Sequence, residues 1–424
     1  MKKMLYLLFA GVLLISGCKT VVLEEVTNFK PSDSQQKGSI QIEWARSISL
    51  NPETRAILAQ NNLFALDFFK AVSKQFDYNL FLSPYSMSAA LGMLYNGANG
   101  ETKKQIAKVL CMDDCTPEEV NQYYYELTKA LLSVDPNTSL SLANAIWANK
   151  GITLQEPFVS LNRNYYDAEV STLDFSLPSA LKTINDWCNE KTKGTIPTIL
   201  ETMPPAIVIL ANAIYFNSFW TYDFDKSKTQ AKFFRNINRT TSAVPMMYLK
   251  HELLYAQMDV CGMVTLPYAN AAFAMNLILP HEGVDVDDLI ADFDGPSWEK
   301  MMLHRSATTV TLSLPRFKIE RKMEGLAGVL AAMGMPLAFS HNADFSAMVE
   351  GVAVYFDQVI QKSYISVDEA GTEASAVTLM AMTGSPGPMP TPPEVTMVFD
   401  RPFFFAITEK STGALLFMGK VTKL

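Results

Sequence analysis

The sequence predicts one large domain of mixed α+β class, and three observations lead to this prediction. Hydrophobic residues make up 49% of the 424-residue chain and charged residues 18%, which is enough apolar surface for a large buried core. Helix-type and strand-type patterns both occur along the chain. No internal repeat or long linker interrupts residues 52–424. At about 150 residues per domain the length would allow two or three domains, but these patterns favour a single body with several helices and more than one sheet.

The first helix is predicted to begin at Asn51-Pro52-Glu53. Asn51 can cap the helix with its side chain, Pro52 fits the first helical position, and Glu53 places a negative charge in the first turn. Apolar residues then recur at the i, i+4, i+7 and i+8 positions of one helix face, at Phe64, Phe68, Ala71 and Val72. A second helix is predicted over residues 85–95, preceded by Ser83-Pro84 and ended by Asn96-Gly97.

Later segments have the character of strands. Residues 207–216, 273–279 and 309–314 are short runs rich in apolar residues. In the last of these, apolar and hydroxyl side chains alternate, because Val310, Leu312 and Leu314 are interleaved with Thr309, Thr311 and Ser313. Successive side chains of a strand point to opposite faces, so this alternation predicts a strand with one buried face.

The N-terminus predicts a lipoprotein signal peptide over residues 1–17. Lys2 and Lys3 precede an apolar stretch, residues 4–15, which is about eight residues shorter than a membrane-spanning helix. The stretch ends in Leu14-Ile15-Ser16-Gly17-Cys18, which resembles the lipobox of bacterial lipoproteins and implies lipidation of Cys18. The alternative is an ordinary secretory signal followed by a chance cysteine.

The polar residues that follow predict a flexible, lipid-anchored tether over residues 18–50, with the folded domain at 51–424. Two or more acyl chains anchor a protein stably where one does not. We therefore expect a protein of the bacterial cell envelope, attached to the membrane through its lipid, on the outer membrane or the cell surface.

The remaining cysteines leave two alternatives open. Cys111 and Cys115 are spaced C-x3-C in an acidic, turn-like segment, and could either close a small disulfide in an oxidising compartment or remain thiols. A metal site would need further soft ligands, and no histidine lies near them in the sequence.

Charge and motif content exclude several functions. The chain has 35 Lys+Arg and 43 Asp+Glu, a net charge of −8, and no long basic run, which argues against nucleic acid or a heparin-like polyanion as partner. No G-x-S-x-G motif occurs, and the four histidines stand in unrelated surroundings, so no nucleophile and base pair is nominated. We expect a monomer without catalytic activity, cofactor or metal.

A set of short motifs resembles the serpin family. They occur in the order and at about the spacing seen in serpins and cover nearly everything after Asn51: Asn79-Leu80-Phe81-Leu82-Ser83-Pro84-Tyr85-Ser86, Asn212-Ala213-Ile214-Tyr215-Phe216 with Trp220, Leu314-Pro315-Arg316-Phe317, Ala343-Asp344-Phe345-Ser346, Asp368-Glu369-Ala370-Gly371-Thr372-Glu373-Ala374, Arg401-Pro402-Phe403 and Phe417-Met418-Gly419. The resemblance implies three β-sheets, about eight or nine helices and an exposed reactive loop at about 369–394. It also implies that Ser83, Ser86, Asn212 and Trp220 control the opening of the largest sheet.

The resemblance implies a suicide-substrate mechanism, and the residues of the loop can be compared with what that mechanism requires. In a serpin, a protease cuts the reactive loop and is held as an acyl-enzyme while the cut loop inserts into the central sheet. An insertable strand needs small side chains on its inward face and no proline. Thr372, Ala374, Ala376 and Thr378 are small and share one strand face, Glu373 and Ser375 lie on the other, and Gly371 follows Glu369 as a flexible hinge. This pattern favours the insertable loop of an inhibitory serpin over a loop with no requirement on the size of its side chains.

The scissile bond is less well defined, because residues 384–393 contain five prolines, the last of them Pro393. Counting from either end of the loop points to a bond before proline, which serine proteases cleave poorly. We therefore predict cleavage slightly earlier, within Met382-Thr383-Gly384-Ser385. No Lys or Arg occurs between Lys362 and Arg401, so trypsin-like targets are disfavoured and elastase, chymotrypsin or subtilisin types fit better. Cysteine proteases remain possible targets, and a non-inhibitory serpin-fold binding module remains the alternative function.

Overall fold

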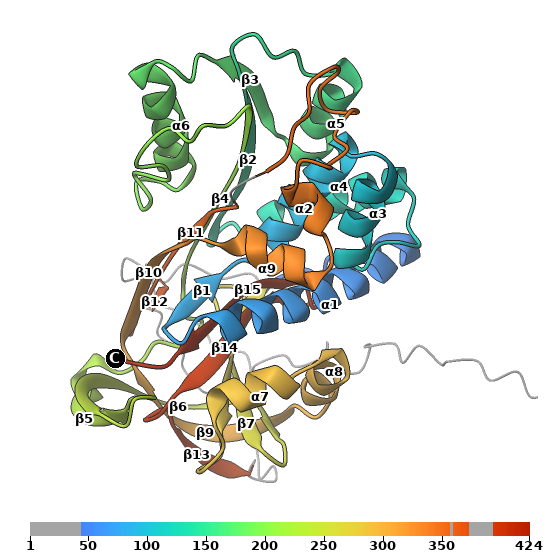
Figure 1. The fold of residues 1–424 in the computed structure, drawn as a ribbon. Coiled ribbons are helices and arrows are strands. Elements are labelled where there is room, and N and C mark those ends of the chain that lie inside the picture. Colours follow the sequence, from blue (N-terminus) through green and yellow to red (C-terminus); the bar gives the residue numbers. More distant parts are fainter. Residues whose placement is uncertain (1–43, 357–358, 373–392) are drawn as a thin grey trace, which may run out of the picture.

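The computed structural model describes residues 44–356, 359–372 and 393–424 (Figure 1). Nine α-helices lie within these residues: α1 (Pro52–Gln75), α2 (Pro84–Gly97), α3 (Gly100–Val109), α4 (Pro117–Ser133), α5 (Glu156–Tyr166), α6 (Pro178–Lys191), α7 (Val286–Asp292), α8 (Gly295–Leu303) and α9 (Leu326–Met333). Two short 3-10 helices, η2 (Lys226–Lys228) and η3 (Pro336–Phe339), accompany them.

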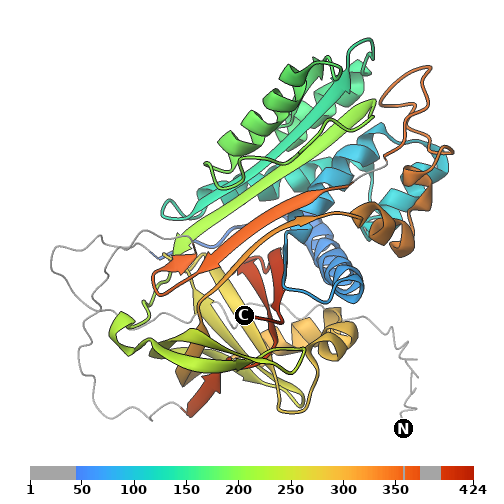
Figure 2. The ribbon, with the colours of Figure 1, turned by 60° about the vertical axis from the view of Figure 1, so that its left-hand side comes forward.

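The described strands form two hydrogen-bonded sheets. The six-stranded sheet has the order β10-β11-β12-β4-β2-β3. Its strands are β10 (Phe317–Met323), β11 (Gln361–Val367), β12 (Gly371–Thr372), β4 (Val208–Phe219), β2 (Ser139–Asn149) and β3 (Glu169–Leu173). In Figures 1 and 2, α6 covers one face of this sheet and α2 lies on the other.

The nine-stranded sheet has the order β1-β15-β14-β8-β7-β6-β9-β13, with β5 also paired to β6. Its strands are β1 (Leu80–Leu82), β15 (Leu415–Val421), β14 (Phe403–Glu409), β8 (Phe273–Pro280), β7 (Cys261–Pro267), β6 (Thr241–Gln257), β9 (Ser306–Pro315), β13 (Glu394–Val398) and β5 (Gln230–Arg235). The 17-residue β6 pairs with β7 near its end and with β9 and β5 before it. It therefore joins two groups of strands into one network. The predicted α+β class is confirmed.

The first two helices begin at the residues that were predicted to cap them. The Asn51 side chain accepts a hydrogen bond from the Thr54 amide at 2.7 Å, and Ser83 caps α2 through the Ser86 amide at 3.1 Å. The predicted end of the second helix at Asn96-Gly97 is confirmed, and both residues lie inside α2, whose last residue is Gly97. A Cβ at Gly97 would lie 2.8 Å from a side-chain atom of Met348, so glycine is required here by close packing.

The main core lies between the nine-stranded sheet and the helices. Every residue of β8, β14 and β15 is buried, and Phe64 and Phe68 of α1 are fully buried as predicted. In β9 the apolar residues Val310, Leu312 and Leu314 are fully buried. A smaller, separate cluster holds α6 on the six-stranded sheet through Trp147 of β2 and Trp187 of α6, whose rings meet edge to face.

Residues 44–50 pack on the domain, although we assigned them to the tether. The Ala45 amide donates to the Asn270 carbonyl at 3.0 Å, and the Ile48 amide donates to Ser411 Oγ at 2.8 Å. Among the described residues, no helix combines the length and apolar character that crossing a bilayer requires. The four described cysteines are free thiols, and burial raises the pKa of Cys188 and of Cys261 to about 11.

Candidate functional site

The predicted hinge enters the six-stranded sheet. Gly371 and Thr372 form β12, which pairs antiparallel with Ser218 and Phe219 of β4 on one side and with Val367 of β11 on the other. Thr372 is buried, with 2% of its surface exposed. Gly371 has a φ of 156°, which residues with a Cβ seldom adopt, so glycine is suited to this turn into the sheet. The first inward-facing residue of the predicted insertable strand is therefore already inside the sheet.

Beyond Thr372, β4 and β11 face each other, and no strand of the described residues lies between them. β4 pairs with β2 over ten residues and β11 pairs with β10 over seven, whereas β12 supplies only two residues between them in the described chain. In Figures 1 and 2 the two strands approach each other at β12 and separate away from it. Unpaired strand edges are a template for strand addition. The sheet can thus receive more of the chain that follows Thr372.

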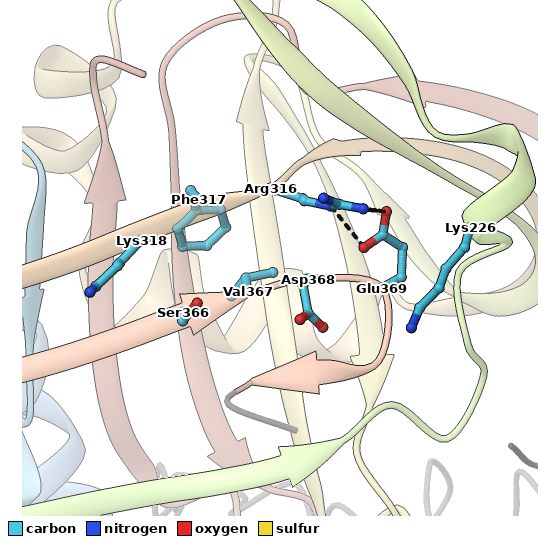
Figure 3. Close-up of a pocket in the computed structure, with 8 residues that line it drawn as sticks. All are labelled: Lys226, Arg316, Phe317, Lys318, Ser366, Val367, Asp368 and Glu369. Atoms are coloured by element: carbon cyan, nitrogen blue, oxygen red, sulfur yellow. Dashed lines mark hydrogen bonds and ion pairs between the residues drawn. The ribbon is translucent and has the colours of Figure 1, made fainter. Parts of the chain in front are cut away.

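An ion pair holds the turn that leads into β12. Arg316 donates from Nε and Nη2 to the Glu369 carboxylate at 2.8 and 2.6 Å, and the Thr229 hydroxyl donates to it at 2.5 Å (Figure 3). Glu369 is 2% exposed. Burial raises the pKa of its carboxyl, but the hydrogen bonds from Arg316 and Thr229 outweigh burial, and its pKa lies below the ordinary value. The carboxylate form is the one this turn stabilises.

Trp220 lies directly behind the hinge. Its indole Nε1 donates to the Asp368 carbonyl at 2.9 Å, and its backbone amide donates to the Ala370 carbonyl at 2.9 Å. The Trp220 ring stacks on Tyr268 with centroids 4.4 Å apart, and the Tyr268 hydroxyl meets the Thr372 hydroxyl at 2.7 Å. Trp220 therefore supports both the turn and the first inserted residue, in a place that suits the predicted role in sheet opening.

Ser83 couples the helix core to the far end of β11. Its hydroxyl donates to the Leu416 carbonyl at 2.7 Å. Gln361 of β11 accepts from the Ser83 amide at 3.0 Å and donates to the Ser83 carbonyl at 3.1 Å. Ser363 of β11 donates in the same way to the Phe81 carbonyl. These buried bonds fix β11 to β1 and to the start of α2, so β11 cannot shift without breaking them.

Asn212 and Ser86 each leave a polar atom without a partner. The Asn212 amide donates to Asn144 Oδ1 at 2.7 Å, while its own Oδ1 is buried and has no hydrogen-bond partner in the described part of the chain. The same holds for Ser86 Oγ. Buried polar atoms without partners are costly, by about 1–3 kcal/mol each. Asn212 lies on β4, so its Oδ1 is suited to a contact that forms only when a further strand pairs with β4.

A lysine of β11 reaches the segment that follows α6. Lys362 Nζ donates to the Thr198 carbonyl at 2.9 Å. The same segment is held to α6 by Asn185, whose Oδ1 accepts from the amides of Ile199 and Leu200 at 2.9 and 3.0 Å. This segment connects α6 to β4, so the Lys362 bond links the two strands on either side of the unfilled position.

The structure brings together part of the predicted site. Glu369, Gly371, Thr372 and Trp220 meet at one end of the unfilled position, and Asn212 lies further along β4. Ser83 and Ser86 lie at the start of α2, where Ser83 bonds to Gln361 of β11. The remaining predicted residues lie outside the described chain: Cys18, Glu373, Ala374, Ser375, Ala376, Met382, Thr383, Gly384 and Ser385. Sequence reasoning did not assign the partners Tyr268, Gln361, Asn144 and Lys362. It named Arg316 only as part of a motif, although a lone charged residue next to a buried strand was a signal for a buried ion pair.

This architecture, a sheet with an unfilled position and a loop root that already enters it, is matched by comparison with known proteins. A sequence model described as serpin (serine protease inhibitor) matches residues 59–424. The chain belongs to the serpin family.

Serpins of two functional kinds are similar to it. Leukocyte elastase inhibitor of Homo sapiens is 31% identical over 85% of this chain and 97% of its own length. Corticosteroid-binding globulin of Oryctolagus cuniculus is 33% identical over 88% of this chain and 97% of its own length. The solved structure of the thermophilic serpin Tengpin in its native state matches with a TM-score of 0.80 and 30% identity, covering 91% of this chain and 98% of that one. Family membership alone therefore does not decide between inhibition and binding.

Proposed function

We propose that this serpin is an irreversible suicide-substrate inhibitor of serine proteases with apolar or small specificity pockets. The protease cuts the reactive loop and forms an acyl bond to it through its serine. The cut loop then continues β12 into the sheet and carries the protease with it. Release of the enzyme fails because its catalytic groups are distorted before water can hydrolyse the ester. The observation that carries this proposal is the entry of Thr372 between β4 and β11, which beyond it have no strand between them in the described part of the chain.

The register of β12 supports insertion of the small-residue strand. Thr372 stands opposite both Val367 and Ser218, so a continued antiparallel strand would place Thr378 between Gln361 and Asn212. A threonine there could donate to the Asn212 Oδ1 that now has no partner among the described residues. About ten new backbone hydrogen bonds along the two edges, at roughly 0.5–1.5 kcal/mol each, would contribute on the order of 10 kcal/mol to the inserted form. The native form is then a kinetically trapped state.

The alternative is a non-inhibitory serpin that binds a ligand and is only cleaved by proteases. The small residues Ala374 and Ala376 oppose it, because a binding module has no need of an insertable strand. The absence of Lys and Arg between Lys362 and Arg401 supports elastase, chymotrypsin or subtilisin types as targets, and papain-like cysteine proteases come second.

One gel experiment distinguishes these functions. A form of the chain in which Cys18→Ser prevents lipidation is mixed with pancreatic elastase and separated under denaturing conditions. A band at the summed mass that survives SDS supports inhibition by trapping. Quantitative loop cleavage without such a band, with elastase and then with subtilisin, refutes the inhibitor proposal and supports the binding module. Mass spectrometry of the released C-terminal peptide locates the cut, which we expect within residues 382–385.

We further propose that Cys18 carries a lipid and attaches the domain to the bacterial envelope, on the outer membrane or the cell surface. Support comes from the lipobox-like residues 14–18 and the charged start of the signal peptide. Metabolic labelling with a fatty-acid analogue in a bacterial host should label the wild-type chain and leave Cys18→Ser unlabelled. Equal labelling of both forms would refute lipidation at this residue.

A further inference from the structure

A strongly basic segment borders the hinge. Residues 226–239 carry five cations and no carboxylate, in a chain whose net charge is −8. The five are Lys226, Lys228, Lys232, Arg235 and Arg239, and all of them are exposed. The segment comprises η2, the edge strand β5 and the turn into β6. We call residues 226–239 the basic ribbon.

Among the residues that the structure describes, three of the five cations have no acidic partner within ion-pair distance. Lys228 pairs with Asp225 at 3.0 Å, and Arg235 pairs with Glu282 at 2.6 Å and with Asp400 at 3.3 Å. The side chains of Lys226, Lys232 and Arg239 contact no other side chain by hydrogen bond or ion pair within residues 44–356, 359–372 and 393–424. The ribbon therefore keeps positive charge that the domain itself does not neutralise, and this charge is available to an approaching partner.

The basic ribbon is attached to the root of the reactive loop. Thr229 binds the Glu369 carboxylate directly. Lys226 lines a hollow of about 480 Å³ together with Arg316, Asp368 and Glu369, and Figure 3 shows its side chain beside the Arg316 and Glu369 pair. The 20 residues between Thr372 and Pro393 start at this point. A protease that binds the ribbon would therefore be held close to the root of the loop.

The ribbon also presents an exposed aromatic ring. Phe233, in the middle of β5, is 71% exposed, whereas the next residue, Phe234, is fully buried. β5 pairs with β6 alone among the described strands, and on its other edge the Arg235 amide donates to the Asp400 carbonyl at 2.7 Å. Aromatic residues and arginines are enriched at surfaces that bind a partner protein, and the ribbon exposes both, in Phe233 and in Arg235 and Arg239.

We propose that the basic ribbon is a docking surface for the target protease, and that it selects proteases whose face beside the active site is acidic. The inference rests on the proposed function, because it takes the partner to be the enzyme that attacks the reactive loop. Charge complementarity of this kind mainly raises the rate of encounter, by factors of about 10 to 1,000 at low salt, and salt reduces the effect. The protein would thus discriminate among proteases that share the same pocket specificity.

The test compares two forms of one protease and two charge-reversal variants. Pancreatic elastase is used as it is and after succinylation of its surface lysines, which makes the same enzyme acidic. We measure the rate at which intact chain is lost, so that trapping and simple cleavage both count. At low ionic strength, K226E/K232E should lower the rate with succinylated elastase about ten-fold, with a much smaller change for the unmodified enzyme, and 0.5 M NaCl should remove most of the difference.

A matched control reverses two exposed lysines of α3, in K104E/K108E, and should change either rate less than about two-fold. K226Q/K232Q should show an intermediate effect, and it replaces the reversal variant if that variant melts at a lower temperature. Phe233→Ala should lower the rate of loss of intact chain by a few-fold with both forms of the enzyme, because an apolar contact does not depend on charge. The ratio of trapped to cleaved product reports on the proposed function separately from these rates.

The proposal is overturned if K226E/K232E and K104E/K108E behave alike, or if succinylated elastase does not attack the loop. It is also overturned if heparin binds the native chain through the same lysines while the acidic protease gains no rate, because the ribbon would then be a polyanion site.

Discussion

The hydroxyl oxygens of Tyr268 and Thr372 lie 2.7 Å apart, and both side chains are buried. Tyr268 belongs to the turn between β7 and β8 and stacks on Trp220, while Thr372 is the last described residue of the hinge. The entry point of the reactive loop into the six-stranded sheet therefore packs directly against a turn of the nine-stranded sheet. Entry of the hinge is a satisfied, packed arrangement and not a loose contact at the surface.

We expect Tyr268 and Thr372 to be energetically coupled. Tyr268→Phe and Thr372→Val each leave one buried hydroxyl without its partner, so each should lower the free energy of unfolding by about 1–2 kcal/mol. The double variant should lose less than the sum of the two, by about 0.5–1.5 kcal/mol. Urea unfolding of the four proteins measures this coupling. Strict additivity would show that the two hydroxyls do not stabilise each other.

The Glu369 ion pair predicts a component of stability that is lost in acid. Because the pKa of Glu369 is lowered in the folded chain, its carboxylate stabilises the fold above the ordinary glutamate pKa of about 4.3. That contribution should disappear as pH falls below this value and through the lower folded pKa. Wild type and Glu369→Gln should therefore differ by a constant amount above pH 5 and converge in acid, when the first unfolding transition is followed by circular dichroism. Parallel curves down to pH 3 would contradict this.

Removal of the Lys362 bond to the Thr198 carbonyl should ease insertion. The bond links β11 to the segment before β4, and the two strands must separate for a new strand to enter. Lys362→Met keeps the apolar stem of the side chain and should raise the ratio of trapped to cleaved product by about two-fold or more. Lys318→Met on the neighbouring β10, where the side chain is 55% exposed, is the control. An unchanged ratio in Lys362→Met would mean that this bond does not restrain the sheet.

Substitutions at the inward positions of the hinge should convert the inhibitor into a substrate. Thr372→Arg places a charge at a site that is 2% exposed, and Ala374→Pro removes a backbone donor that the inserted strand needs. Both variants should still be cut by elastase, with the SDS-stable band reduced at least about ten-fold. Glu373→Gln, on the opposite strand face, should trap normally. Trapping at wild-type yield by both Thr372→Arg and Ala374→Pro would refute the hinge assignment.

Loop cleavage should raise heat resistance. A cut strand that pairs with the free edges of β4 and β11 adds hydrogen bonds and relieves buried polar atoms such as Asn212 Oδ1. We expect the nicked chain to melt at least about 20 °C above the intact one, since ten or so added hydrogen bonds are large against a net stability of about 5–15 kcal/mol. Thermal unfolding of both forms at equal concentration measures this, and equal melting temperatures would mean that the native chain stores no conformational energy.

Local patterns predicted much of the fold but not all details of the site. The caps Asn51 and Ser83 were identifiable because a capping side chain bonds an amide only three residues away. Gly97 was predicted correctly as the end of α2, but the structure gives a further reason for glycine there, which is close packing against Met348. Met348 is 251 positions away in the chain, so this contact leaves no local signature. The basic ribbon was present in the sequence as five scattered cations, and its meaning depended on its place beside the hinge.

The sequence by itself determined the first two helices, three of the strands, the serpin-like motifs and the small residues of the hinge, because each of these is encoded within a short window of chain. Only the tertiary structure decided which residues meet: Arg316 with Glu369, Gln361 with Ser83, and Tyr268 with Thr372, which are 53, 278 and 104 positions apart. The physical reason is that a ladder register, once fixed at β12, sets the partners of every position along β4 and β11. The pattern of side chains within a single strand does not specify how that strand is aligned with its neighbours.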